Sequence, residues 1–275
     1  MKINFFIIIS LIAILSTSCV TTEFYQICKI TPESNIATKD NLLVYEDNNC
    51  KVLYNLWDDG GSVGFQFYNK TEINIYINLE ECFFIDNGIA NNYYKNRVYS
   101  YSTNTGSTQS IAQSMTGLNS LHLIQTNSAS VNAMSTNGRS VSSKEESLIC
   151  IPALSSKIIK EYSVTETPYR DCDLLRNPNK TQIKTLTFKK ENSPIVFSNR
   201  IEYKVGQTGT PIKFENKFFV SEITNYPKSE IIESKDDKYC GEVISTSIEK
   251  TEYFKNVSQD KFYIKYSWGS TDFKH

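Results

Sequence analysis

The chain has 275 residues, of which 40% are hydrophobic, and its formal net charge at pH 7 is −1. A chain of this length can form one large β domain or two small ones. The near-zero charge provides no basic surface for nucleic acid, so we expect no nucleic-acid partner. The 17 tyrosines and 15 phenylalanines favour strands, because aromatic side chains fit a pleated, half-buried surface.

The first 18 residues have the order of a secretory signal peptide. A charged start at Lys2 precedes an almost wholly apolar run from Phe5 to Leu15, and small residues follow up to Ser18. As a helix, the run would be roughly 16 Å long, too short to cross a hydrocarbon core of about 30 Å. We therefore expect residues 1–18 to be cleaved off, with an uncleaved anchor helix as the alternative.

The segment from Leu15 to Cys19, Leu-Ser-Thr-Ser-Cys, resembles the lipobox of bacterial lipoproteins. In that class, cleavage occurs directly before the cysteine, whose thiol and new amino group are both acylated. Leu15 stands four residues before Cys19 rather than the usual three, as in the relaxed lipoboxes of Bacteroidetes-type lipoproteins. The resemblance implies a palmitate-type lipid anchor on Cys19, a tether over residues 19–23 and attachment to a membrane. The alternative is ordinary secretion.

The residues after Cys19 bear on which membrane face the protein occupies. Val20 is not the aspartate that retains some lipoproteins at the inner membrane. Residues 20–23 also lack the lysine and acidic residues that direct lipoproteins of this type to the cell surface. Both features favour a periplasm-facing position at the outer membrane.

Six further cysteines remain after Cys19 is set aside, and none forms a Cys-x-x-Cys pair. Three disulfides are therefore allowed in an oxidising compartment, while buried free thiols are an equal alternative. The spacing argues against a zinc knuckle and against thioredoxin-like redox chemistry. These cysteines are Cys28, Cys50, Cys82, Cys150, Cys172 and Cys240.

Residues 42–79 show the clearest strand pattern. Apolar side chains alternate with polar ones in short runs, and turn signals such as Asp58-Asp59-Gly60-Gly61 and Asn69-Lys70-Thr71 separate the runs. This pattern predicts an antiparallel meander with one buried face. Residues 100–147 differ, because they are rich in Ser, Thr, Asn and Gly with little periodicity. We interpret them as a long, polar, flexible insertion, in which residues 109–124 could form one weak amphipathic helix.

Strand-like segments return after the insertion and continue almost to the end of the chain. No long helix is expected in the mature chain, and residues 227–241 are interpreted as a loop. The pattern favours a mainly β fold, an antiparallel β-sandwich that is generically immunoglobulin-like, occupying residues 24–275. Residues 24–99 and 148–225 would form the sandwich, and the last fifty residues would add strands or form an appendage. The expected strands cover 148–151, 157–164, 181–188, 195–205, 212–220, 243–248 and 262–268.

Recognisable catalytic chemistry is scarce in this sequence. The two histidines are His122, inside the insertion, and His275, the last residue. Catalysis by a serine or cysteine nucleophile needs an adjacent base, and the usual nucleotide-binding and zinc motifs are missing, so we expect no cofactor and no metal. Adjacent acids are usually solvated turn residues, although two carboxyls on facing strands would suit a glycan hydrolase. These acids are Asp58-Asp59, Glu80-Glu81, Glu145-Glu146 and Asp236-Asp237.

Four tyrosines at the exit of the meander are the candidate binding residues. Tyr93, Tyr94, Tyr99 and Tyr101 stand among Asn and Arg residues, a combination that can stack on a glycan or contact a protein. The alternative is an edge strand whose tyrosine rings lie against the sandwich. The sequence thus predicts a lipid-anchored, non-catalytic binding or structural protein of the cell envelope. A carboxylate-based glycan hydrolase is the alternative function.

Overall fold

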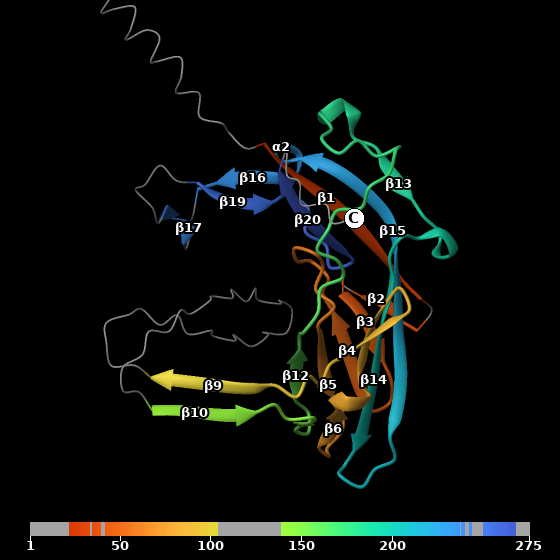
Figure 1. Cartoon of the computed structure of the whole chain (residues 1–275), viewed down its shortest axis with the longest axis vertical. Coiled ribbons are helices and arrows are strands. Elements are labelled where there is room, and N and C mark those ends of the chain that lie inside the picture. The colour runs from red at the N-terminus through yellow and green to blue at the C-terminus, as the bar shows by residue number, and fades with distance from the viewer. Residues whose placement is uncertain are drawn as a thin grey trace, which may run out of the picture.

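A computed structural model describes residues 22–33, 35–39, 42–103, 139–236, 238–239, 242–243 and 250–267. These residues form two packed β-sheets and three two-stranded ribbons, in which all the pairings between named strands are antiparallel (Figure 1). The predicted antiparallel β-sandwich is therefore confirmed. The predicted signal peptide, Cys19, the expected helix at 109–124, both histidines and Cys240 lie outside the described residues.

The larger sheet is built around two long neighbouring strands, and the sequence predicted only part of their residue ranges. β15 is 16 residues long and pairs with both β14 and β1. The main strand order is β11-β6-β14-β15-β1-β20. Its members are β1 (Glu23–Pro32), β6 (Ile75–Asn78), β11 (Leu148–Ile151), β14 (Val196–Val205), β15 (Ile212–Pro227) and β20 (Lys261–Ser267). Three short strands extend this sheet. β7 (Phe83–Asp86) pairs with β14, β8 (Ile89–Asn92) pairs with β7, and β13 (Thr185–Thr187) pairs with β15.

The smaller sheet confirms the first part of the predicted meander. Its order is β12-β5-β4-β3-β2, so four consecutive strands of the chain lie side by side. Its members are β2 (Ala37–Lys39), β3 (Leu42–Glu46), β4 (Cys50–Tyr54), β5 (Phe65–Asn69) and β12 (Ser156–Ile159).

The meander does not continue into β6, which crosses to the larger sheet. The crossing follows Asn69, a fully buried residue whose Nδ2 donates to the carbonyls of Ile73, Ile151 and Pro152 at 2.8, 3.2 and 3.0 Å. These bonds satisfy the backbone where the chain changes sheets, as buried carbonyls require. β6 then pairs with β14, so the alternating run at 73–79 buries its apolar face from the opposite side of the core.

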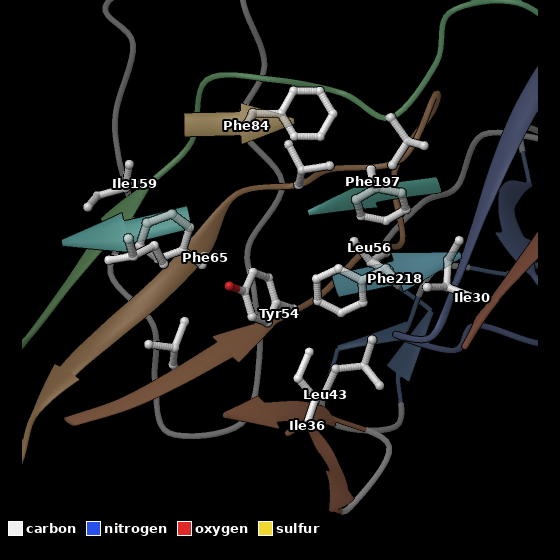
Figure 2. Close-up of a cluster of buried hydrophobic side chains, with 14 of the residues drawn as sticks. Ile30, Ile36, Leu43, Tyr54, Leu56, Phe65, Phe84, Ile159, Phe197 and Phe218 are labelled. Atoms are coloured by element: carbon white, nitrogen blue, oxygen red, sulfur yellow. The ribbon is translucent and has the colours of Figure 1, made fainter. Parts of the chain in front are cut away.

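The hydrophobic core lies between the two sheets (Figure 2). Tyr54 and Phe65 of the smaller sheet meet Phe197 and Phe218 of the larger one. The rings of Phe197 and Phe218 stack with centroids 5.1 Å apart, and Tyr54 packs edge-on against Phe218 at 5.1 Å. The Tyr54 hydroxyl accepts a hydrogen bond from Nδ2 of Asn216 at 2.8 Å, so its polar end is satisfied. Such aromatic packing accounts for the high content of tyrosine and phenylalanine in the chain.

The C-terminal region both adds a strand and forms an appendage. β20 extends the larger sheet by pairing with β1. The predicted loop at 227–241 is wrong in part, because α2 (Lys228–Ile231), β16 (Ile232–Lys235) and β17 (Lys238–Tyr239) fall within it. β16 pairs with β19 (Thr251–Phe254), and β17 pairs with β18 (Glu242–Val243). The β16–β19 pairing is nonlocal in sequence, whereas β17 and β18 form a short local hairpin, and the polar pattern of the segment indicated neither.

The two ends of the insertion pair with each other. β9 (Val98–Thr103) and β10 (Arg139–Lys144) form a ribbon that projects sideways from the sandwich in Figure 1. The flexibility expected for the rest of the insertion stays a prediction, since residues 104–138 are outside the described ranges. Short 3-10 helices occur at η1 (Leu79–Glu81), η2 (Lys180–Gln182) and η3 (Lys190–Asn192), and η2 replaces the start of the strand expected at 181–188.

The five described cysteines are free thiols. Cys28, Cys50 and Cys82 are buried in the core, whereas Cys150 and Cys172 are exposed. Burial raises the pKa of Cys82 to about 12, so this thiol behaves as a small apolar core group. The buried-thiol alternative is therefore the one observed for these three residues.

Candidate binding surface

Tyr93 belongs to the core, and its assignment to an exposed surface is corrected. Its exposed fraction is 2%, and its ring packs edge-on against Phe65 and Tyr162. Its hydroxyl donates to Oδ1 of Asn199 at 2.7 Å, and Asn199 donates through Nδ2 to the Val63 carbonyl at 2.9 Å. Burial raises the pKa of Tyr93 well above its ordinary value. A partner could not reach this ring without disrupting the sandwich.

The other predicted tyrosines differ in their surroundings. Tyr94 is half-buried, and its hydroxyl donates to Oδ1 of Asn96 at 3.0 Å. Tyr99 is 40% exposed, and the Arg97 guanidinium carbon lies 5.8 Å from its ring centroid. Tyr101 lies on β9, but its side chain is outside the described part. Tyr94 and Tyr99 thus stay candidates, on either side of Arg97 in the chain.

A shallow, open depression of about 540 Å³ lies beside Tyr94. Its rim is rich in amides, and their hydrogen-bonding groups are only partly used. Asn91 donates to the Ile89 carbonyl at 3.3 Å and Asn96 accepts from Tyr94, while the Asn92 side chain has no hydrogen-bond partner among the described residues. The lining includes Asn91, Asn92, Tyr94, Lys95, Asn96 and Tyr162. We call this surface the amide depression.

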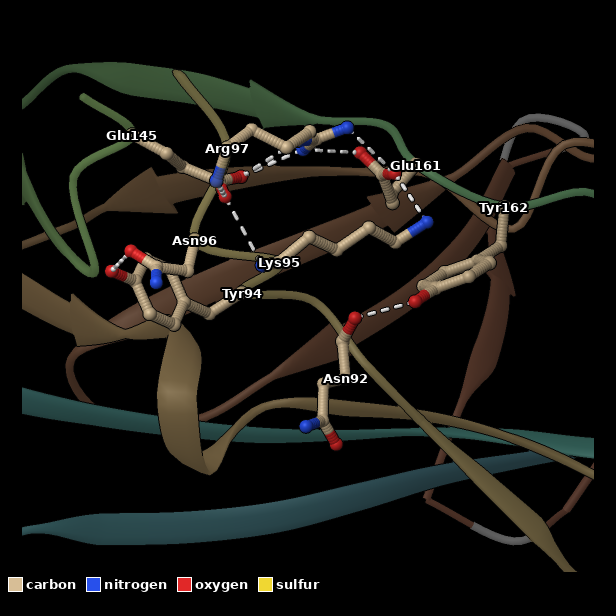
Figure 3. Close-up of polar contacts among 8 residues, drawn as sticks. All are labelled: Asn92, Tyr94, Lys95, Asn96, Arg97, Glu145, Glu161 and Tyr162. Atoms are coloured by element: carbon tan, nitrogen blue, oxygen red, sulfur yellow. Dashed lines mark hydrogen bonds and ion pairs between the residues drawn. The ribbon is translucent and has the colours of Figure 1, made fainter. Parts of the chain in front are cut away.

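A cluster of charged residues fixes the chain beneath the amide depression (Figure 3). Arg97 binds two carboxylates at once. Its Nη2 lies 2.7 Å from Oε1 of Glu145 and 2.8 Å from Oε2 of Glu161, and its Nη1 lies 2.9 Å from Oε1 of Glu161. Oε2 of Glu145 also accepts the backbone N–H groups of Lys95 and Arg97 at 3.1 and 3.0 Å. We call Lys95, Arg97, Glu145 and Glu161 the Arg97 cluster.

Lys95 connects the Arg97 cluster to the floor of the depression. Its Nζ lies 2.8 Å from Oε1 of Glu161 and 4.6 Å from the ring centroid of Tyr162. The Tyr162 hydroxyl in turn donates to the Asn92 carbonyl. The chain that carries the depression is therefore held by side chains from the segment after β12, as Figure 3 shows.

The surroundings of Glu145 and Arg97 favour the charged forms of both side chains. Burial alone would raise the pKa of Glu145, but the Arg97 guanidinium and the backbone N–H groups of Arg97 and Lys95 together lower it. The hydrogen bonds that Arg97 donates to Glu145 and Glu161 raise the pKa of Arg97. Glu145 and Arg97 therefore stay ionised near neutral pH, which suits a structural ion pair.

The adjacent acids of the sequence occupy turns and ion pairs. Asp58 and Asp59 form the predicted turn, and Oδ2 of Asp58 lies 2.8 Å from Nζ of Lys160. Oε2 of Glu81 lies 2.9 Å from Nζ of Lys213. Asp236 is exposed and Asp237 is outside the described residues. Two of these acids are brought together with a second acid on a shared cation, Glu145 with Glu161 on Arg97 and Glu81 with Glu202 on Lys213.

Sequence reasoning missed Glu161 and Tyr162, which complete the site. Glu161 is 64 residues from Arg97 and Tyr162 is 70 residues from Asn92. A local pattern carries no signal for such contacts. The compact group of Asn91, Asn92 and Asn96 was visible in the sequence, but the binding role was assigned to the tyrosines.

No family model matches the chain, and neither the curated proteins nor the solved structures that were compared contain a match. Within the described ranges, no group of three or more His, Cys, Asp or Glu side chains is placed to hold a metal ion. No helix in that part of the chain is long and apolar enough to span a membrane.

Proposed function

We propose that this chain is a lipid-anchored, non-catalytic protein of the bacterial cell envelope that binds a glycan through the amide depression. The lipid anchor is proposed at Cys19, after cleavage of residues 1–18, and the expected location is the periplasm-facing side of the outer membrane. A protein partner at the same surface is the alternative occupant.

The observation that carries the proposed glycan is the concentration of unused amide groups beside tyrosine rings. Asn92 offers both a donor and an acceptor, and Asn91 and Asn96 keep part of their capacity. Amides can pair with sugar hydroxyls, which also donate and accept. Tyr94 supplies ring surface for the apolar face of a sugar. The depression is shallow, as expected for an extended ligand rather than an enclosed small molecule.

The proposal of a non-catalytic role rests on the state of the paired carboxylates. A glycosidase needs one carboxyl with a raised pKa to act as the general acid. The pKa of Glu145 is lowered, and Glu161 is engaged by Arg97 and Lys95. Such a pair supports a role in holding the chain rather than in proton transfer.

The test is binding of the full chain to an array of envelope and host glycans, followed by titration of any glycan that binds. We expect Asn92→Ala to weaken binding at least tenfold, because it removes both hydrogen-bonding groups of that side chain. The matched control is Asn48→Ala, because Asn48 is an exposed asparagine in the β3–β4 turn whose side chain has no hydrogen-bond partner among the described residues.

The results of these experiments distinguish a glycan from a protein as the occupant of the amide depression. Equal binding by wild type and Asn92→Ala would contradict a role for the amide depression. If no glycan binds, capture of an envelope protein that is lost in Asn92→Ala but kept in Asn48→Ala would identify a protein partner instead.

A further inference from the structure

Four aromatic side chains from distant parts of the chain pack together beside the start of β1. Trp57, in the connection between β4 and β5, meets Phe254 of β19 edge-on with ring centroids 5.1 Å apart. Tyr263 of β20 lies 5.4 Å from Trp57 and 4.6 Å from Phe254. Tyr25 of β1 packs edge-on against Phe254 at 5.6 Å and is buried, whereas the other three side chains are half-buried. We call Trp57, Phe254 and Tyr263 the aromatic cluster. None of them belongs to the amide depression.

The polar ends of the aromatic cluster are not used within the described part of the protein. Tyr263 lies on the face of the larger sheet that is turned away from the core, because its strand neighbours Phe262 and Ile264 belong to the core. The Tyr263 hydroxyl and the Trp57 indole N–H form no hydrogen bond with the described residues, and neither group is buried. Rings with an apolar body and a free polar end suit a boundary between apolar and aqueous surroundings.

Ion pairs next to the aromatic cluster fix the start of β1. The Glu23 carboxylate is paired with Nζ of Lys265 and, at 2.9 Å, with Nζ of Lys228. Nζ of Lys228 also lies 2.8 Å from Oε1 of Glu252. Because these two cations and two carboxylates balance each other, the group presents no net charge to a partner.

The proposed lipid anchor brings the start of β1 close to a membrane. Cys19 precedes Glu23 by four residues. A fully extended chain of that length spans about 14 Å at most. A lipid-bearing Cys19 lies at the headgroups, so Glu23 cannot be farther than this from them. Tyr25, which contacts the aromatic cluster, shares a face of β1 with Glu23 because side chains two residues apart in a strand point the same way.

We propose that the face carrying the aromatic cluster lies on the surface of the lipid bilayer, with Trp57, Phe254 and Tyr263 at the level of the headgroups. This inference rests on the lipid anchor proposed above and adds the orientation of the protein on the membrane. Tryptophan and tyrosine are enriched at this level because each ring has an apolar body and a polar end. In Figure 1 the β9–β10 ribbon lies far from the start of β1, so such docking leaves that end of the molecule free.

The test is the fluorescence of Trp57 in the full chain, purified with its lipid and reconstituted into vesicles of phosphatidylethanolamine and phosphatidylglycerol. The sequence has two tryptophans, so Trp268→Phe makes Trp57 the only one. Lipids brominated near the top of their acyl chains should remove about half of the Trp57 emission, because an indole at the headgroup level lies within reach of the bromine atoms.

Two further variants separate docking from proximity alone. A flexible insertion of about ten Gly and Ser residues between Thr21 and Thr22 lengthens the tether. Quenching should persist, because the tether still keeps the effective concentration of the docking face at the membrane high. The matched control combines Tyr99→Trp with Trp57→Phe and Trp268→Phe, which places the only tryptophan on the ribbon, at a position that is 40% exposed. Its emission should not be quenched.

The proposal is overturned if brominated lipids leave the Trp57 emission unchanged, if the longer tether abolishes the quenching, or if the control tryptophan at position 99 is quenched equally. The mass of the N-terminal peptide distinguishes these results from a failure of the lipid anchor. An unmodified peptide overturns the anchor and this inference together, whereas an acylated peptide without quenching overturns this inference alone.

Discussion

At the scale of single residues, Tyr93 shows how one hydroxyl joins the site to the core. It lies directly before Tyr94 in the chain, yet its ring packs between the sheets and its hydroxyl satisfies Asn199. Tyr94 is only half-buried and lines the amide depression. The amide depression is therefore placed at the surface by a tyrosine that is itself inaccessible.

We predict that Tyr93→Phe lowers the free energy of unfolding by about 1–2 kcal/mol, because Oδ1 of buried Asn199 would lose its partner. Tyr99→Phe is the control, since Tyr99 is exposed and should change stability by less than about 0.5 kcal/mol. Urea unfolding followed by circular dichroism measures both. An equal, small effect of the two substitutions would contradict the buried hydrogen bond.

The Arg97 cluster leads to a prediction about pH. The pKa of Glu145 is lower in the folded protein than its ordinary value of 4.5, so its ionised form stabilises the fold. That contribution is complete above pH 4.5 and is lost as the pH falls through the folded pKa. The difference in unfolding free energy between wild type and Glu145→Gln should therefore be largest near pH 7 and should shrink below pH 4.5. A constant difference from pH 7 to pH 3 would contradict this account.

At the scale of elements, the turn at Asp58–Gly61 protects an edge of the larger sheet. Gly60 N–H donates to the Tyr263 carbonyl at 2.8 Å, and the Tyr263 N–H donates to the Asp58 carbonyl at 3.3 Å. Oδ1 of Asp59 accepts the Lys265 N–H at 3.2 Å. The turn thus occupies backbone groups of β20 that an edge strand would otherwise expose to other chains.

We expect Gly60→Ala to destabilise the protein more than Gly88→Ala. Both glycines have a positive φ, +74° and +88°, which costs an alanine about 1 kcal/mol. At Gly60 an added Cβ would also lie 2.5 Å from the Thr165 carbonyl oxygen, whereas nothing lies within 4 Å at Gly88. Thermal unfolding of the two variants measures the contrast. Equal unfolding temperatures would show that the turn does not hold the position described.

Strands with one wet face could be predicted from the sequence, and other strands could not. β4 and β5 alternate between buried and half-buried positions, which is a local signal. β1 lies between β15 and β20 and carries the buried polar residue Gln26, so its pattern was not recognised as a strand. The crossing of β6 depends on β14, more than 100 residues later, and has no local signal at all.

At the scale of the whole molecule, the class of fold follows from many short apolar runs, whereas the sites depend on contacts between distant segments. Glu161 reaches Arg97 across 64 residues, and Tyr162 reaches Asn92 across 70. Residue types alone could suggest tyrosines as binding groups, but burial decided which of them are available.

The proposed lipid anchor determines where every partner of the protein must be sought. The most direct measurement is the mass of the N-terminal peptide of the protein purified from the membranes of its host. We predict an acylated peptide that begins at Cys19, with the lipid lost in Cys19→Ser. An unmodified peptide that begins at another residue would contradict the lipoprotein assignment and with it the proposed place at the membrane.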